Sequence, residues 1–277
     1  MAQPRPGELA LMVWIRQQPV HSASRRLLNW VRDRIFKGVG KSQRAYFVTI
    51  NGHRYKRVVF GDSAQALEVA SALEAYRDCV ALPQLVLAQE NEIWVRFVDG
   101  RRPDPGQASD WQALNDFFAA LYAKGSYQTD LNATPIHQRL LIDLAFLRDS
   151  GVFTGKTQER LALAAERLKP EQIWFGADYV DPVLKNFVVN ERGLHVIDIE
   201  SLQSPVVLGT GLAKSGLHWL GQRQHEFFER LLGQTGVPDL RPQQEYVELS
   251  FIAGWTKRKL LTGKWSRVKA ERFERFF

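Results

Sequence analysis

Three oxygen-bearing side chains stand close together in the second half of the chain, in a pattern that suits metal-assisted chemistry. Asp181 begins the stretch Asp-Pro-Val-Leu-Lys-Asn, which ends at Asn186, and Asp198 follows after two short apolar runs and a turn. Carboxylate and amide oxygens are the hard ligands that a divalent ion such as Mg²⁺ prefers when it bridges phosphate oxygens. The pattern therefore favours phosphoryl transfer to a hydroxyl group.

The spacing of these residues allows their side chains to meet. Asn186 lies five residues after Asp181, an offset that lets both side chains face the same cleft. Asp198 lies twelve residues after Asn186, which leaves room for a strand, the turn Asn190–Gly193 and a returning strand. We therefore expect the three side chains to lie on neighbouring loops.

The first part of the chain predicts a helix followed by a small β-rich region. Residues 1–36 have helical periodicity with arginines on the polar side. Two β-rich runs, 45–50 and 55–60, are joined by Asn51-Gly52, a strong hairpin signal. A helix over 64–79, capped by Asp62 or Ser63 and with Leu67, Ala70 and Leu73 on its apolar face, precedes strands over 84–88 and 92–98.

The remainder of the chain predicts mainly helices. Gly and Pro residues between Asp99 and Gly106 predict a boundary, so we expect an N-terminal lobe over 1–98 and a C-terminal lobe over 99–277. Helices are expected over 109–123, 135–148, 157–168, 218–232 and 243–261. The segment with Asp181, Asn186 and Asp198 is the one β-like stretch expected in this half.

With these motifs in place, the chain resembles the protein-kinase-like superfamily over roughly residues 36–232. It is most similar to the branches that act on small substrates, the aminoglycoside and choline phosphotransferases and the lipopolysaccharide-core sugar kinases. The resemblance implies an α+β, bilobal fold with ATP and Mg²⁺ as cofactors. It also implies that Asp181 is the catalytic residue that takes the hydroxyl proton, and that Asn186 and Asp198 bind the metal.

The chain departs from the family pattern at several positions. Tyr179 and Val180 stand where a His and a Gly or Arg commonly precede the catalytic Asp, so the orienting work of that His must be done otherwise. Glu200 follows Ile199 where protein kinases have Phe-Gly, a departure that favours the small-substrate branches. Asp178 is a rival base, but it lacks the spacing to Asn186.

The family also implies a Lys that reaches the nucleotide phosphates and a helix Glu that holds it. Lys56 is the best candidate for the Lys and Arg57 its rival, because alternation along a strand puts one of the pair on each face. Glu68 is preferred to Glu74 for the acidic partner. Each of these residues could equally be a surface charge.

Glycines just before the first hairpin suggest a phosphate-covering loop. Gly38 and Gly40 lie in Lys-Gly-Val-Gly-Lys-Ser, which can serve as that loop or as its entry. The end of this segment also matches a P-loop, but Ile35 occupies the position of the required first Gly, and neither a preceding strand nor a following helix is expected. The P-loop is therefore rejected.

Composition and charge indicate the cellular compartment and the kind of partner. The chain has 277 residues, one cysteine and a net charge of +7. The single cysteine excludes an internal disulfide and fits a reducing cytoplasm, and no run is long enough to cross a bilayer. The basic excess favours a small-molecule or glycan acceptor that is anionic, and Trp255 and Trp265 among basic residues suggest peripheral contact with the anionic inner-membrane surface.

Three hypotheses follow for the function. The first is an ATP- and Mg-dependent kinase acting on a non-protein hydroxyl, with a lipopolysaccharide-core sugar as one such acceptor. The second is a pseudokinase or nucleotide-binding scaffold with the same fold, which the departures at Tyr179 and Val180 favour. The third, a nucleic-acid-binding protein, rests on charge alone and lacks any recognition motif, so it is not expected.

Overall fold

The computed structural model describes residues 44–277, which form two compact units. One unit takes in the described residues up to Arg77 together with Leu82–Asp99, and the other takes in Asp78–Ala81 and Gly100–Phe277. The helix expected over residues 1–36 and the glycine loop with Gly38 and Gly40 lie outside the described residues.

The first unit contains an antiparallel sheet with the strand order β1-β2-β4-β3. Its strands are β1 (Arg44–Ile50), β2 (His53–Val59), β3 (Leu85–Gln89) and β4 (Glu92–Arg96). The turn between β1 and β2 is the predicted one, because Asn51 and Gly52 both adopt positive φ angles, 50° and 77°. A two-residue turn of this kind matches the twist of the strands that it joins.

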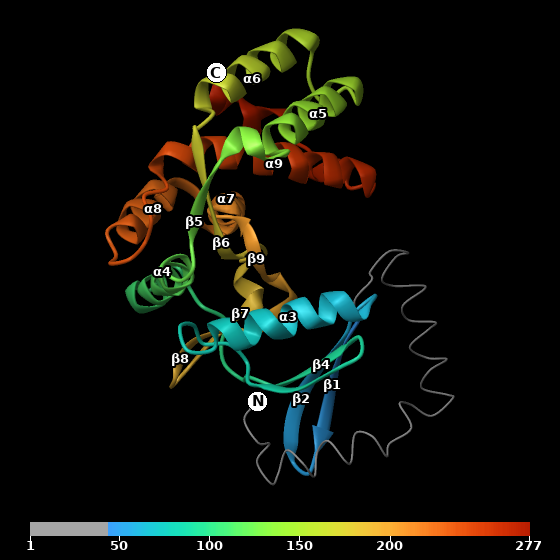
Figure 1. Cartoon of the computed structure of the whole chain (residues 1–277), viewed down its shortest axis with the longest axis vertical. Coiled ribbons are helices and arrows are strands. Elements are labelled where there is room, and N and C mark those ends of the chain that lie inside the picture. The colour runs from blue at the N-terminus through green and yellow to red at the C-terminus, as the bar shows by residue number, and fades with distance from the viewer. Residues whose placement is uncertain (1–43) are drawn as a thin grey trace. The chain divides into compact units, whose positions relative to one another are not determined.

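Helix α3 (Ser63–Tyr76) lies in the same unit (Figure 1). The side chain of Asp62 caps it by accepting a hydrogen bond of 2.9 Å from the backbone N–H of Gln65. Ala70 and Leu73 are buried as expected, but Leu67 is 67% exposed, so its place on the apolar face was predicted wrongly. The buried face of α3 is instead centred on Ala66, Ala70, Leu73 and Tyr76.

The second unit contains more strands than the sequence predicted. A hairpin of β7 (Phe187–Asn190) and β8 (Gly193–Val196) is present as expected. A separate antiparallel sheet, with the order β5-β6-β9, was missed. Its strands are β5 (Tyr127–Asp130), β6 (Gln172–Tyr179) and β9 (Leu202–Val207), and β6 leads directly to Asp181.

Helices make up the rest of the second unit, close to the predicted positions. They are α4 (Ala108–Tyr122), α5 (Ile136–Asp149), α6 (Gly155–Leu168), α7 (Thr210–Ser215), α8 (Gln224–Leu232) and α9 (Gln244–Leu261). In Figure 1, α9 lies beside α5 and α6, and these three helices share an apolar core that includes Leu144, Leu161 and Ile252. Helix α8 begins later than predicted, because a π-helical turn and a 3₁₀ turn occupy residues 216–223.

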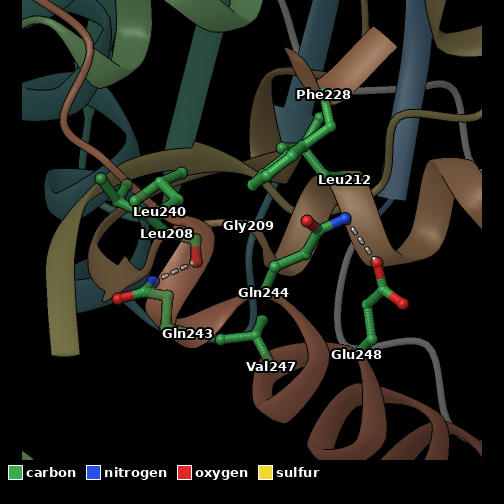
Figure 2. Close-up of a pocket in the computed structure, with 9 residues that line it drawn as sticks. All are labelled: Leu208, Gly209, Leu212, Phe228, Leu240, Gln243, Gln244, Val247 and Glu248. Atoms are coloured by element: carbon green, nitrogen blue, oxygen red, sulfur yellow. Dashed lines mark hydrogen bonds between the residues drawn. The ribbon is translucent and has the colours of Figure 1, made fainter. Parts of the chain in front are cut away.

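A small cavity lies within this unit, where α7, α8 and α9 meet (Figure 2). The side chain of Gln243 donates a 2.9 Å hydrogen bond to the backbone oxygen of Leu208, and Gln244 donates to Glu248 over 3.2 Å. The cavity has a volume of about 10 Å³, which is room for a single water molecule, so the cavity is too small to bind an acceptor.

None of the described helices combines the length and hydrophobicity needed to span a membrane.

Candidate functional site

The strand β6 delivers Asp181 to a loop that is tightly fixed by backbone hydrogen bonds. Val180 donates to the carbonyl of Ser201 over 2.8 Å, and Val183 donates to the carbonyl of Asp181 over 2.9 Å. A 3₁₀ turn over Leu184–Asn186 then leads into β7. The loop is therefore held at both ends, which fixes the position of the Asp181 side chain.

Asn186 connects the loop of Asp181 to the loop of Asp198. Its side-chain nitrogen donates to the backbone oxygen of Asp181 over 2.8 Å, and to Oδ2 of Asp198 over 3.3 Å. The residue is 7% exposed. The structure thus brings together the three residues on which the sequence pattern rests, and it does so through a single buried amide.

The carboxylate of Asp198 is oriented by neighbouring donors. Ser201 Oγ donates to Asp198 Oδ2 over 2.9 Å, the same oxygen that faces the Asn186 amide. The backbone nitrogen of Ile197 donates to the carbonyl of Asn186 over 2.9 Å, which ties the two loops together a second time. The sequence analysis did not identify Ser201, although it lies only three residues after Asp198.

Tyr179 occupies the position where the family pattern has a His, and its hydroxyl contacts the loops of Asn186 and Asp198. Its hydroxyl is 3.1 Å from the carbonyl of Asp198 and 3.3 Å from the carbonyl of Asn186. The ring is fully buried and packs against Phe117 and Phe187, with centroids 5.6 and 5.1 Å away. Burial, reinforced by the charge of Asp198, raises the pKa of Tyr179 well above its usual value, so the hydroxyl remains a donor.

Lys214 is a second residue that the sequence analysis did not identify. Its ammonium forms an ion pair with Oδ1 of Asp181, and the two side chains are 14% and 37% exposed. Lys214 lies on α7, whose start is anchored to β6 because the backbone nitrogen of Gly211 donates to Asp178 Oδ2 over 2.9 Å. No local sequence signal could have paired Lys214 with Asp181, since the contact depends on how α7 packs on β6.

Asp178, the rival candidate for the base, is buried and holds α7 against β6. It is fully buried, and its carboxylate accepts from the backbone of Gly211 at the start of α7. Burial raises its pKa to about 6, against the lowering effect of hydrogen bonds from Gly211 and from the hydroxyl of Tyr122. A carboxylate without solvent exposure cannot reach an acceptor, so Asp181, which is partly exposed, is the better placed base.

The phosphate-anchoring candidates lie in the first unit. Arg57 is 6% exposed and binds Glu92 through two of its guanidinium nitrogens, with Nε 2.8 Å from Oε2. Lys56 lies on the opposite face of the sheet, in register with Phe47 and Val95. Arg57 is thus engaged by a carboxylate of its own sheet.

The two acidic candidates on α3 are both exposed. Glu74 forms an ion pair of 2.8 Å with Arg77 on the same helix. Glu68 makes no ion pair with any residue in the described part of the chain, so the structure does not bring it together with Lys56.

The segment that follows β4 was expected to form the crossing between the lobes. Arg101 forms two hydrogen bonds with Asp110, of 2.5 and 2.8 Å, at the start of α4. Its backbone pairs with Val189 of β7 through bonds of 3.0 and 2.7 Å. Gly100 is required here, because a Cβ at this position would lie 2.6 Å from the carbonyl oxygen of Val189.

The described part of the site supplies few side chains that could bind a metal ion. Among residues 44–277, no group of three or more His, Cys, Asp and Glu side chains is arranged to bind a metal ion. The pair Asn186 and Asp198 supplies fewer ligands than such a group. It suits Mg²⁺, which commonly takes one or two protein ligands and completes its shell with water and substrate phosphates.

Comparisons with known proteins identify the fold. No family model and no curated protein sequence matches the chain. Among solved structures, it is similar to macrolide 2'-phosphotransferase type I, at 15% identity and a TM-score of 0.58, over 89% of this chain and 95% of that one. A ternary complex of aminoglycoside phosphotransferase APH(4)-Ia with ADP and hygromycin B has 12% identity and a TM-score of 0.60, covering 86% and 91% of the chains.

A third similar structure is the choline kinase LicA from Streptococcus pneumoniae, at 11% identity and a TM-score of 0.57, over 92% of this chain and 98% of that one. These similarities extend over most of each chain. They confirm the α+β, protein-kinase-like fold expected from the sequence.

Proposed function

We propose that the chain is a phosphotransferase that moves the terminal phosphoryl group of ATP, with Mg²⁺, to a hydroxyl of a non-protein acceptor. The observation that carries the proposal is the position of Asn186. Its amide nitrogen lies 2.8 Å from the backbone oxygen of Asp181 and 3.3 Å from Oδ2 of Asp198. One buried side chain thereby joins the loop of the base to the loop of the metal ligand.

Asp181 is the group that takes or orients the proton of the acceptor hydroxyl. Its carboxylate is partly exposed, so a hydroxyl group can approach it. The ammonium of Lys214 pairs with one carboxylate oxygen, which fixes the direction of the side chain and leaves the other oxygen for the acceptor. This pairing keeps the carboxylate in a single geometry, as proton transfer in a phosphoryl-transfer reaction requires.

Asn186 and Asp198 are the residues that would hold Mg²⁺. The side-chain oxygen of Asn186 accepts no hydrogen bond from a described residue, and the Asp198 carboxylate is fixed by Ser201. When bound there, Mg²⁺ would supply positive charge that offsets the negative charge of the phosphates. The protein's own part is to hold these two ligands in place, through Tyr179 and the hydrogen bonds between the two loops.

Lys56 is the preferred phosphate-binding side chain of the first unit. Arg57 is buried against Glu92, whereas Lys56 is partly exposed on the other face of the sheet. Glu68 is the preferred acidic partner of Lys56, because Glu74 pairs with Arg77. Gly38 and Gly40, outside the described residues, keep their proposed role in covering phosphates.

A lipopolysaccharide-core sugar is the acceptor that we would test first. The similar structures are named for hydroxyl-bearing small molecules such as choline, which supports a non-protein acceptor for this chain. The net charge of +7 supports an acidic glycan over a neutral one. Such an acceptor fits a cytoplasmic protein that contacts the inner membrane peripherally, and Trp265, which is 60% exposed, is an aromatic residue that could make that contact.

A nucleotide-binding scaffold is the second candidate function. The ion pair between Lys214 and Asp181 favours it, because the ammonium already occupies one oxygen of the carboxylate that a kinase would need as its base. A scaffold requires the metal site formed by Asn186 and Asp198 but does not require the carboxylate of Asp181.

Two variants measured together test the proposal. Mg-ADP at about one hundred times its dissociation constant should stabilise the wild type by roughly 2.7 kcal/mol, seen as a rise in the melting temperature. Asp198→Asn should lose most of that rise. Asp181→Asn should keep it and should lower the transfer of phosphate from ATP, with a base contributing about 10²- to 10⁴-fold.

The possible outcomes separate the candidates. The absence of any nucleotide-dependent shift in the wild type would overturn both the kinase and the scaffold. Equal transfer by wild type and Asp181→Asn would remove Asp181 from the mechanism, and nucleotide binding without transfer to any acceptor would favour the scaffold.

A further inference from the structure

Four basic side chains and one histidine, from four different segments, gather near Asp181. Lys214 comes from α7, His218 from the π-helical turn Gly216–Leu220, and Lys259 from the last turns of α9. Lys264 and Arg267 come from the turn that follows α9. These five residues are called the cationic cluster below.

One side of the cationic cluster is attached to the loop of Asp181. Lys214 forms an ion pair with the carboxylate of Asp181. The next residue after His218 is Trp219, whose indole nitrogen donates to the backbone oxygen of Pro182 over 2.7 Å. Since Pro182 follows Asp181 directly, this hydrogen bond holds the π-helical turn against the loop of the base.

The other side of the cluster is formed by a tight turn at the end of α9. The backbone nitrogen of Lys264 donates to the carbonyl of Lys259 over 2.8 Å, and that of Arg267 donates to the carbonyl of Lys264 over 3.1 Å. Gly263 makes the turn possible with a φ angle of +69°. The ammonium of Lys259 lies 5.0 Å from the ring centroid of Trp255, which is buried.

The two sides of the cluster act on each other electrostatically. Among the described residues, the charges that act most strongly on the imidazole of His218 are those of Lys214, Asp181, Lys259 and Arg267. The charges that act most strongly on the ammonium of Lys259 are positive ones, those of Lys264, Arg258, Arg267 and Lys214. Burial, followed by this repulsion, lowers the pKa of Lys259.

Several basic residues elsewhere in the second unit form ion pairs with carboxylates, whereas three members of the cluster do not. Lys257 pairs with Asp143 over 2.6 Å, Arg275 with Glu248 over 2.8 Å, and Arg241 with Glu229 over 2.7 Å. Within residues 44–277, Lys259, Lys264 and Arg267 form no ion pair with any carboxylate. Like charges held together at this density raise the local potential and attract an anion.

We infer that the acceptor carries an anionic group, a phosphate or a carboxylate, that binds the cationic cluster while its hydroxyl group faces Asp181. This inference rests on the proposed function, because it takes Asp181 as the base. The ion pair between Lys214 and Asp181 joins the anion site to the reacting end of the acceptor. The cluster therefore selects acidic acceptors and disfavours cationic ones.

Binding of matched sugars in the presence of Mg²⁺ and a non-hydrolysable ATP analogue tests this inference. The analogue occupies the nucleotide site, so phosphate-bearing probes must bind elsewhere. Glucose 6-phosphate, glucuronate, glucose and glucosamine differ mainly in charge, and inorganic phosphate serves as the minimal anion. We expect the two acidic sugars to bind at least about ten-fold more tightly than glucose, which is about 1.4 kcal/mol, and glucosamine to bind least.

The variant Lys259→Gln/Lys264→Gln/Arg267→Gln should reduce that preference to about one. The matched control Arg139→Gln/Lys156→Gln/Arg230→Gln removes the same net charge from exposed positions on α5, α6 and α8, and it should retain the preference. A larger effect for glucose 6-phosphate than for glucuronate would assign the site to phosphate, and the reverse would assign it to carboxylate.

Several outcomes would overturn the inference. These are no preference for acidic probes in the wild type, an equal preference in both triple variants, and tighter binding of glucosamine than of glucose 6-phosphate. Cluster-dependent binding to phosphatidylglycerol vesicles without any preference among the sugars would also overturn it, in favour of a membrane surface. If the wild type shows a nucleotide-dependent thermal shift but no preference for anions, only this inference is wrong. If the wild type shows no such shift, the proposed function is wrong.

Discussion

The hydroxyl of Tyr179 lies 3.1 Å from the backbone carbonyl of Asp198 and donates a hydrogen bond to it. Tyr179 ends β6, two residues before Asp181, so this bond connects the strand of the proposed base to the loop of the proposed metal ligand. The family pattern assigns such orienting work to a His. Here a phenol buried among aromatic rings makes the contact, and burial raises its pKa well above the usual value, so the hydroxyl stays a donor.

Replacing Tyr179 by Phe should loosen both loops. The change removes one donor from the carbonyls of Asp198 and Asn186, which keep the backbone hydrogen bonds from Ser201 and Ile197, so it should cost about 0.5–1.5 kcal/mol in the free energy of unfolding. Affinity for Mg-ADP should fall as well, since the Asp198 loop is less well fixed. Urea unfolding and Mg-ADP titration measure the two effects.

The control for this experiment is Tyr127→Phe. Tyr127 is 48% exposed and lies on β5, so its hydroxyl contributes to neither loop. If Tyr179→Phe and Tyr127→Phe behave alike in both assays, the hydrogen bond of Tyr179 has no orienting role.

Replacing Lys214 should slow phosphoryl transfer without weakening nucleotide binding. Lys214→Gln removes the cation paired with Asp181, and a charge-assisted hydrogen bond is worth about 1.5–3 kcal/mol. The expected fall in kcat is therefore about ten- to a hundred-fold. Lys214→Arg should retain more activity than Lys214→Gln, because it keeps the charge.

Steady-state kinetics with ATP as the varied substrate separates these effects. Lys156→Gln, at an exposed position on α6, is the matched control for the loss of one lysine. A Lys214→Gln variant with unchanged kcat would show that the ion pair is only structural, and a large rise in the KM for ATP would place Lys214 at the nucleotide instead.

Gly211 should tolerate no side chain. A Cβ at this position would lie 2.4 Å from the carbonyl oxygen of Tyr179 and 2.6 Å from Oδ1 of Asp178. Gly211→Ala must therefore push α7 away from β6, at a cost of about 1–3 kcal/mol, and move Lys214 with it. The melting temperature and the transfer activity should both fall.

Gly155 offers the comparison for this variant. It opens α6, and a Cβ there meets no atom within 4 Å, so Gly155→Ala should leave stability unchanged or raise it slightly. A Gly211→Ala variant as stable and active as Gly155→Ala would mean that α7 is not seated on β6 as described.

The features that the sequence predicted correctly are those with local causes. The turn at Asn51-Gly52 and the cap at Asp62 follow from the backbone preferences of single residues, and the helices follow from a periodic apolar face. The hairpin β7–β8 followed from the spacing between Asn186 and Asp198.

The features that the sequence missed depend on tertiary packing. Strand β6 is almost continuously buried at its end and shows no alternation, so its periodicity gave no strand signal. Leu67 has helical spacing yet is exposed, because the burial of α3 is set by the sheet beneath it. Lys214 and Asp181 meet only because Gly211 lets α7 approach β6 closely. The spacing of residues along the sequence cannot predict such a pair.

The last prediction concerns Asp178 and the pH dependence of stability. Burial raises the pKa of this carboxyl from 3.8 to about 6 in the folded protein. The folded chain therefore binds the proton more tightly than the unfolded chain between those values, and the stability that the protonated form contributes is lost as the pH rises through about 6. Between pH 4.5 and 7.5 this loss should be about 2 kcal/mol, with roughly 3 kcal/mol over the full range.

Asp178→Asn should remove this part of the pH dependence. The amide oxygen of the new side chain can still accept from the backbone nitrogen of Gly211, and no charge has to be buried at neutral pH. Urea unfolding of wild type and variant at pH 4.5, 6 and 7.5 gives the difference directly, and Asp149→Asn, on the exposed end of α5, controls for the loss of a carboxylate. Parallel stability curves for wild type and Asp178→Asn would mean that Asp178 titrates normally, and its buried position beneath α7 would then be wrong.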